Sequence, residues 1–165
     1  MKAHFSRSLF LAFVFFSASV FSQTSEIVKL LNGHLKNDLG IKTEYNHFGD
    51  IIKIVKPYTF LGNILKVELE YKGENGHYIE QQEAALNKIT GIGKDINVIL
   101  DTEESAVKIN RKYIGKSNAE PEYNGVNNMF FTGIRFQKHN KHFGEPLQKA
   151  FEKAGYEIEL GSWYD

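Results

Sequence analysis

Apolar residues recur at helical spacing in the segment that follows residue 24. They share one face of a helix and are Ile27, Leu30, Leu31, Leu35 and Leu39. Thr24 and Ser25 stand where an N-terminal cap is expected, and Gly40 stands where a left-handed C-terminal cap is expected. The pattern therefore predicts an amphipathic helix over residues 25–38.

After this helix, the period of the apolar positions falls to two. Apolar and charged residues alternate over residues 65–71, which is the clearest strand pattern in the chain. A shorter run over residues 51–55 predicts a preceding strand that ends at Pro57, because proline cannot donate a ladder hydrogen bond. Turn-forming residues at 62–63 and 73–76 predict that these strands and the next one form hairpins.

The middle of the chain contains further short runs of strand-forming residues. A strand is expected over residues 78–83, although the composition of residues 78–88 also fits a helix, and this alternative stays open. The remaining predicted strands cover residues 89–92, 96–100, 106–113, 129–136 and 156–160. Residues 114–128 have no apolar period and are rich in glycine, asparagine and serine, which predicts a long surface loop.

A second amphipathic helix is expected near the C-terminus. Pro146 fits a first helical position, and Gly155 fits the position after the last turn. Between them lies an apolar stripe made of Leu147, Ala150, Phe151 and Ala154. The sequence thus predicts an α+β fold with an N-terminal helix, an antiparallel meander sheet of about six to eight strands, and a C-terminal helix packed on that sheet.

The first 22 residues have the pattern of a secretory signal peptide. Lys2 and Arg7 precede an apolar run that ends at Phe21 and is shorter than the ~20 residues needed to span a bilayer. Val20 and Ser22 are suitably small for cleavage before Gln23. We therefore expect a periplasmic or secreted protein in which residues 23–165 form a single globular domain with no transmembrane segment.

Composition removes several classes of function. The chain has 20 basic and 20 acidic side chains, so no excess of either sign indicates nucleic acid as a partner. It has no cysteine, which excludes disulfides, thiolate zinc sites and cysteine nucleophiles. The common serine hydrolase and zinc protease motifs are also absent from the sequence. An enzyme is therefore not the favoured interpretation.

Two groups of residues are candidates for a metal or an acid–base site. His139 and His142 lie three residues apart, and a third ligand would have to come from His47, Asp50 or His77. Lysines on both sides of the histidine pair oppose a bound cation, so solvated histidines are the favoured interpretation.

The three carboxylates of Asp101, Glu103 and Glu104 are consistent with a solvated turn and lack the glycine of a calcium loop. The sequence therefore predicts no metal or cofactor.

The remaining candidates are aromatic. Aromatic residues make up 13% of the chain, and many of them follow residue 113. Phe131 and Arg135 fall on the face of the predicted 129–136 strand opposite Phe130 and Ile134, and Tyr123 lies in the preceding segment. Exposed aromatic and arginine side chains are enriched where proteins bind partners. Phe131, Arg135 and Tyr123 are therefore the predicted binding residues, unless the N-terminal helix covers that face.

The order of elements supplies one resemblance. Short strands containing residues 89–92 and 94–102, followed by a further strand and a terminal helix with Leu147, Ala150 and Phe151, resemble pleckstrin-homology-like domains and small exported bacterial proteins. The resemblance covers roughly residues 50–154 and implies a sheet capped by a helix, with a binding role. This chain differs in its additional N-terminal helix and in lacking a basic cluster in the first strand loops.

These observations favour an exported, non-catalytic domain that binds a protein, a peptide or an envelope component. The alternative is a small metal-dependent or hydrolytic enzyme that uses His139 and His142. The identity of the partner and the oligomeric state have no signal in the sequence.

Overall fold

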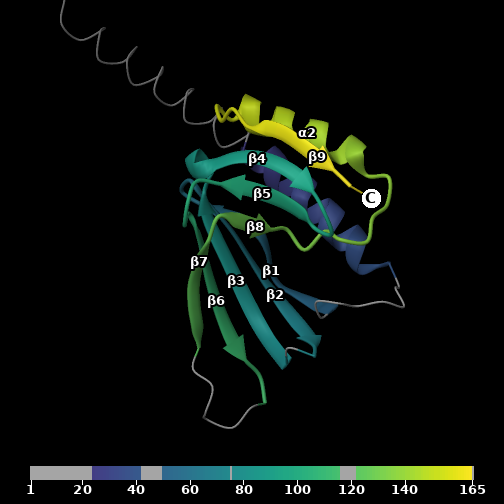
Figure 1. The fold of residues 1–165 in the computed structure, drawn as a ribbon, viewed down its shortest axis with the longest axis vertical. Coiled ribbons are helices and arrows are strands. Elements are labelled where there is room, and N and C mark those ends of the chain that lie inside the picture. The colour runs from purple at the N-terminus through teal and green to yellow at the C-terminus, as the bar shows by residue number, and fades with distance from the viewer. Residues whose placement is uncertain (1–23, 42–49, 75, 116–121, 165) are drawn as a thin grey trace, which may run out of the picture.

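The computed structural model describes residues 24–41, 50–74, 76–115 and 122–164, which form two β-sheets and two helices (Figure 1). The N-terminal helix covers residues 24–39, and helix α2 covers Lys141–Lys153. The strands are β1 Asp50–Leu61, β2 Ile64–Gly73, β3 Gly76–Ala85, β4 Ile89–Lys94, β5 Val98–Thr102, β6 Val107–Tyr113, β7 Tyr123–Asn127, β8 Met129–Phe131 and β9 Glu159–Trp163. The predicted α+β class, with an N-terminal and a C-terminal helix, is confirmed, and one strand, β9, follows the second helix. The predicted signal peptide lies outside the described residues.

The large sheet contains five antiparallel strands in the order β1-β2-β3-β6-β7. Strands β2 and β3 form the predicted hairpin, with Tyr71 opposite Tyr78 and Gly73 opposite Gly76. This pairing settles the choice between strand and helix: the strand continues to Ala85, and a single 3-10 turn, Leu86–Lys88, leads out of the sheet.

The small sheet has the order β8-β5-β4-β9, with β9 parallel to β4. The strands therefore do not make the single meander that the sequence predicted. Strands β4 and β5 leave the large sheet, and β6 returns to pair with β3. That return places the buried side chains of Val107 and Ile109 opposite Ala84 and Gln82, which widens the apolar face of the large sheet.

Strand β1 does not end at Pro57, and the prediction that it does is wrong. The register with β2 shifts between Lys56 and Thr59, and β1 lies at the edge of the large sheet. The missing N–H of proline is tolerated at a bulge in an edge strand. Tyr58, the residue after the proline, uses its backbone groups to bind the N-terminal helix. The Tyr58 N–H donates to Asn32 Oδ1 (2.8 Å), and Asn32 Nδ2 donates to the Tyr58 carbonyl (3.0 Å).

Three further predictions need correction between residues 114 and 146. Part of the predicted loop is strand β7, paired with β6. The predicted 129–136 strand stops at Phe131, because Gly133 turns the chain with a φ of +74°. Helix α2 starts at Lys141 and contains Pro146, which the sequence had placed at its first position.

The two helices lie side by side and antiparallel. Lys153 of α2 reaches Glu26 of the N-terminal helix (3.3 Å), and about two turns further along that helix the His34 ring stacks on Phe143 at 3.8 Å between centroids. Ile27, Leu31 and Leu35 of the N-terminal helix are fully buried in the core. Within the described residues, no helix has the length and apolar character needed to cross a membrane.

The segment that joins β8 to α2, residues 132–140, is not a strand, yet several of its backbone groups are buried. Asp38, at the end of the N-terminal helix and only 1% exposed, accepts three backbone N–H bonds from it: Arg135 to Oδ2 (3.0 Å), and Phe136 (2.8 Å) and Gln137 (2.9 Å) to Oδ1. Lys94 Nζ donates to the Gln137 carbonyl (2.8 Å). One carboxylate therefore fixes the path of this segment against the helix.

Replacing Asp38 is expected to destabilise the fold strongly. In Asp38→Asn, the charge is lost and an amide N–H₂ faces backbone donors, so the free energy of unfolding should fall by about 3 kcal/mol. Urea unfolding followed by circular dichroism measures the change. Asp101→Asn, at an exposed carboxylate, is the matched control and should stay within about 0.5 kcal/mol of the parent. Equal stability of the two variants would contradict this role of Asp38.

Candidate functional site

A row of tyrosines crosses the inner face of the large sheet at one end. Tyr71 of β2, Tyr78 of β3 and Tyr113 of β6 occupy adjacent register positions. The Tyr71 and Tyr78 rings stack with centroids 5.3 Å apart, and Tyr113 is tilted against Tyr78 at 5.6 Å. Because alternate residues of a strand share a face, the hairpin at 73–76 brings the first two together.

The next row of the same face carries charge. Glu80 of β3 forms an ion pair with Arg111, which lies opposite it on β6. The Arg111 guanidinium also lies over the rings of Tyr78 and Tyr123, at 5.2 Å from each centroid. Tyr123 owes this position to Gly125, where a Cβ atom would come within 2.3 Å of the phenol oxygen. Arg111 is thus held by one carboxylate and two aromatic faces.

The surroundings set the protonation of these groups. Burial, and then the charge of Glu80, raise the pKa of Tyr71 and of Tyr78 above the usual tyrosine value. Burial acts to lower the pKa of Arg111, but the hydrogen bond and the charge of Glu80 outweigh it, so that pKa is raised as well. At neutral pH the site therefore presents neutral phenol groups beside a guanidinium that stays charged.

The opposite wall comes from the small sheet and from the segment after it. Together the two walls form a half-open cavity of about 360 Å³, which we call the tyrosine–arginine cavity. Its lining residues are Tyr71, Tyr78, Glu80, Asp95, Ile96, Asn97, Ile99, Arg111, Phe131 and Arg135. Ile96, at the turn between β4 and β5, is 54% exposed at this site. The cavity combines aromatic faces, aliphatic side chains and two guanidinium groups.

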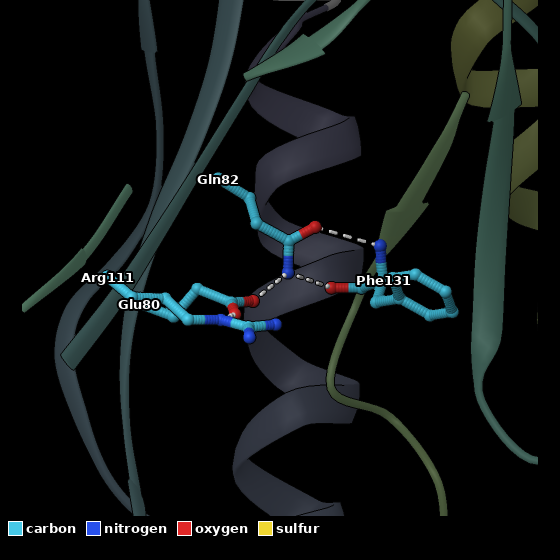
Figure 2. A network of polar contacts seen from close by, with 4 residues as sticks. All are labelled: Glu80, Gln82, Arg111 and Phe131. Carbon is cyan, nitrogen blue, oxygen red and sulfur yellow. Dashed lines mark hydrogen bonds and ion pairs between the residues drawn. The ribbon is translucent and has the colours of Figure 1, made fainter. Parts of the chain in front are cut away.

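A single glutamine connects the two walls (Figure 2). Gln82 of β3 is only 1% exposed, and its amide binds the backbone of Phe131 on β8: Oε1 accepts the N–H (3.0 Å), and Nε2 donates to the carbonyl (3.1 Å). Nε2 also donates to Glu80 Oε1 (2.9 Å), as the dashed lines in Figure 2 show. The Gln82 amide thus makes the two backbone hydrogen bonds that a neighbouring strand would make to Phe131. Its bond to Glu80 also connects Phe131 to the Glu80–Arg111 pair.

The three predicted binding residues lie close to this cavity. Phe131 and Arg135 line it, and the Arg135 guanidinium lies 4.9 Å from the centroid of the Phe136 ring. Tyr123 is not among the lining residues but covers Arg111 from β7. The N-terminal helix does not remove Phe131 from this cavity. Binding by these residues stays a prediction.

Sequence reasoning missed four of the residues that give the cavity its character. They are Tyr71, Tyr78, Glu80 and Arg111. The signal for the two tyrosines was present, because they flank the predicted hairpin turn in matching positions. Arg111 had no such signal, because the meander rule did not place β6 beside β3.

The candidate metal ligands are not gathered together. His139 is exposed and has a φ of +53°, and the Nδ1 atom of His142 lies 3.1 Å from the His139 carbonyl oxygen. His77 pairs with Glu70 on the large sheet (2.7 Å). Asp50 begins β1 and His47 lies outside the described residues. Among the residues described, no three histidine, aspartate or glutamate side chains are arranged to hold a metal ion.

The acidic turn between β5 and β6 also has a structural partner. Glu103 forms an ion pair with Lys88 (2.6 Å), at the end of the 3-10 turn. This contact links the turn to the start of the small sheet and fits the solvated turn that the sequence favoured.

No family model, curated protein or solved structure matches this chain. The resemblance to pleckstrin-homology-like domains therefore stays a prediction, and the functional argument depends on the cavity itself.

Replacing Gln82 should separate the two walls of the cavity. In Gln82→Met, the partly buried N–H and carbonyl of Phe131 lose their partners, so the free energy of unfolding should fall by about 2–4 kcal/mol in urea titrations. Gln81→Met is the matched control, because Gln81 lies next to it on the opposite face and its amide donates only to Glu83 among the contacts observed. A control that is destabilised as much as Gln82→Met would refute the bridging role.

Proposed function

We propose that this chain is a non-catalytic binding domain and that the tyrosine–arginine cavity is its binding site. The observation that carries the proposal is the cavity itself: about 360 Å³, lined by three aromatic rings and two guanidinium groups. Small-ligand sites typically have volumes of ~300–1,000 Å³ and combine apolar walls with a few fixed polar groups. This composition favours recognition of a group that is both flat and polar.

The rim of the cavity supports the proposal. Ile96 on one side and Tyr123 on the other are both large hydrophobic residues with about half of their surface in solvent. A partner that enters the cavity would cover part of both, which removes apolar surface from water. The same residues would contribute to the binding of a peptide or of an envelope component.

Hydrogen bonds hold the backbone of the wall that faces the tyrosines. The Phe131 backbone is bonded to Gln82, and the Arg135 backbone is bonded to Asp38. A site whose backbone is held before the ligand arrives loses less conformational entropy on binding. This arrangement favours binding over an enzyme that uses His139 and His142, because the two histidines are not among the lining residues.

We also propose that the domain is exported, with the signal peptide removed before Gln23. The support is the sequence pattern of residues 1–22 described above. Export would place the cavity in contact with periplasmic or extracellular partners.

Binding of small aromatic probes tests the proposed site. Phenol, indole, benzamide, 3-phenylpropionate and 3-phenylpropylamine are titrated into the protein and followed by NMR chemical shifts. At least one should bind with a Kd of about 1 mM or lower, and Phe131→Ala should weaken it by about tenfold because an aromatic face is lost.

Tyr164→Ala is the control, since Tyr164 is an aromatic residue near the C-terminus that is 65% exposed and outside the cavity lining. The affinity of Tyr164→Ala for the probes should equal that of the parent protein. The proposal fails if none of the probes binds at 10-fold higher concentrations, about 10 mM, or if Phe131→Ala binds as tightly as the parent.

A further inference from the structure

We infer that the outer edge of strand β7 pairs with the β7 edge of a second copy of this chain, so that two molecules share one antiparallel sheet. The inference goes beyond the proposed function, because it concerns the edge of the large sheet and not the lining of the cavity. It follows from the direction of the backbone groups of β7, from its side chains, and from how the other sheet edges are closed.

The hydrogen-bond ladder of the large sheet determines which backbone groups of β7 face outward. In an antiparallel pair, opposite residues that exchange two backbone bonds alternate with opposite residues that exchange none. The Ile114 N–H donates to the His77 carbonyl (2.8 Å), so the even-numbered residues of β6 bond to β3 and the odd-numbered ones bond to β7. The partners of these odd-numbered residues on β7 are Tyr123, Gly125 and Asn127. The N–H and carbonyl groups of Asn124 and Val126 therefore point to the open edge.

No described strand pairs with this edge. β7 is the last strand of the large sheet, and no described element lies beyond it in Figure 1. The strand pairs with β6 without a register shift, and it contains neither proline nor a charged residue. Bulges, prolines and charged side chains are features by which proteins prevent an edge strand from pairing with another chain. Because β7 has none of them, its edge can accept a strand.

The other three edges of the two sheets carry such features. β1 contains Pro57 and three register shifts, and Asn32 binds its backbone at Tyr58. β8 is three residues long and is bonded by Gln82. β9 begins with the exposed charge of Glu159 and shifts register where it pairs with β4. The contrast indicates that a partner strand adds at β7.

A second copy satisfies the outward backbone groups of β7 at once. When two β7 strands lie antiparallel about Gly125, Asn124 of each copy is opposite Val126 of the other. Each of these two pairs exchanges two backbone hydrogen bonds, which makes four bonds and leaves none of these outward groups without a partner. The arrangement has two-fold symmetry, so the same edge serves both copies.

The side chains of β7 permit this close approach. Gly125 meets its counterpart at the centre of the pair, where opposite Cα atoms come within ~4.5 Å of each other. Since the strand has no charged residue, no like charges meet across the pair. Tyr123 and Val126, which are 46% and 58% exposed, lie opposite Asn127 and Asn124 of the second copy. Pairing therefore removes part of their apolar surface from water.

The contact is small, so the dimer is weak. The joined sheet has ten strands, five from each copy, which open sheets can reach. However, each copy contributes only the edge of a five-residue strand, which is less than the ~1,200–2,000 Å² buried in stable interfaces. We therefore expect a Kd of about 0.1–1 mM.

Sedimentation equilibrium tests the association, and amide hydrogen exchange followed by NMR locates it. Between about 0.05 and 1 mM protein, the average mass should rise from near that of the monomer toward twice that value. Over the same range, exchange of the Asn124 and Val126 N–H groups should slow by about two- to threefold. The N–H of Glu104, in the exposed turn between β5 and β6, should keep its rate.

Variants of Val126 connect the association to the edge. Val126→Pro removes an outward N–H but spares the ladder with β6, and it should weaken association by about tenfold or more. Val126→Thr keeps the N–H and the β-branched shape, and it should associate like the parent. Thermal unfolding verifies that both variants are folded.

A charge provides a second test that leaves the backbone unchanged. Val126→Lys places two like charges in the pair and should also weaken association. Ile52→Lys is the matched control, because Ile52 is 49% exposed on β1, at the opposite edge of the same sheet. Its association should equal that of the parent.

A protein that stays monomeric at about 1 mM would overturn the inference and would leave the β7 edge to a strand from a different protein. A dimer would also overturn it if exchange of Asn124 and Val126 does not slow, or if Val126→Pro and Val126→Lys associate like the parent, because the contact would then lie elsewhere. None of these results affects the proposed cavity, which the aromatic probes test separately.

Discussion

Buried backbone groups that belong to no strand or helix must still find hydrogen-bond partners, and this requirement shapes the centre of the molecule. Here single side chains supply those partners. Gln82 pairs with Phe131, Asn32 pairs with Tyr58, and Asp38 holds three consecutive N–H groups that begin at Arg135. The two amides imitate a neighbouring strand and close an edge that would otherwise lack a partner at that point. These three polar residues join the large sheet, the small sheet and the N-terminal helix.

The cavity forms because these side chains hold the two sheets and the N-terminal helix together. The large sheet contributes the tyrosine row and the Glu80–Arg111 pair, and it would present them on an open face if nothing stood opposite. Gln82 and Asp38 hold Phe131 and the backbone of Arg135 in front of that face. Stability and the proposed binding therefore depend on the same contacts, since the groups that hold the two walls together also hold the backbone of Phe131 and of Arg135 opposite the tyrosine row.

The local pattern of the sequence predicted much of the fold, and long-range pairing explains what it missed. Alternation identified β2 and the hairpin to β3, and helical spacing identified the N-terminal helix. The pairing of β6 with β3 depends on which apolar faces pack best, and local sequence patterns do not predict that pairing. Gln82 lies on the buried face of β3 between Glu80 and Ala84. The role of a polar residue at such a position cannot be predicted until its hydrogen-bond partner is known. Phe131 and Arg135 were predicted from an alternation over residues 129–136, but the strand ends at Phe131, and Arg135 reaches the cavity from the segment after β8.

Native-state amide hydrogen exchange followed by NMR tests the central claim most directly. If Gln82 and Asp38 hold the segment after β8, the N–H groups of Phe131, Phe136 and Gln137 should exchange only with opening free energies close to that of global unfolding. Exchange of these three groups as fast as that of exposed turns would contradict the account, because the wall that carries Phe131 and Arg135 would then open without unfolding of the sheets.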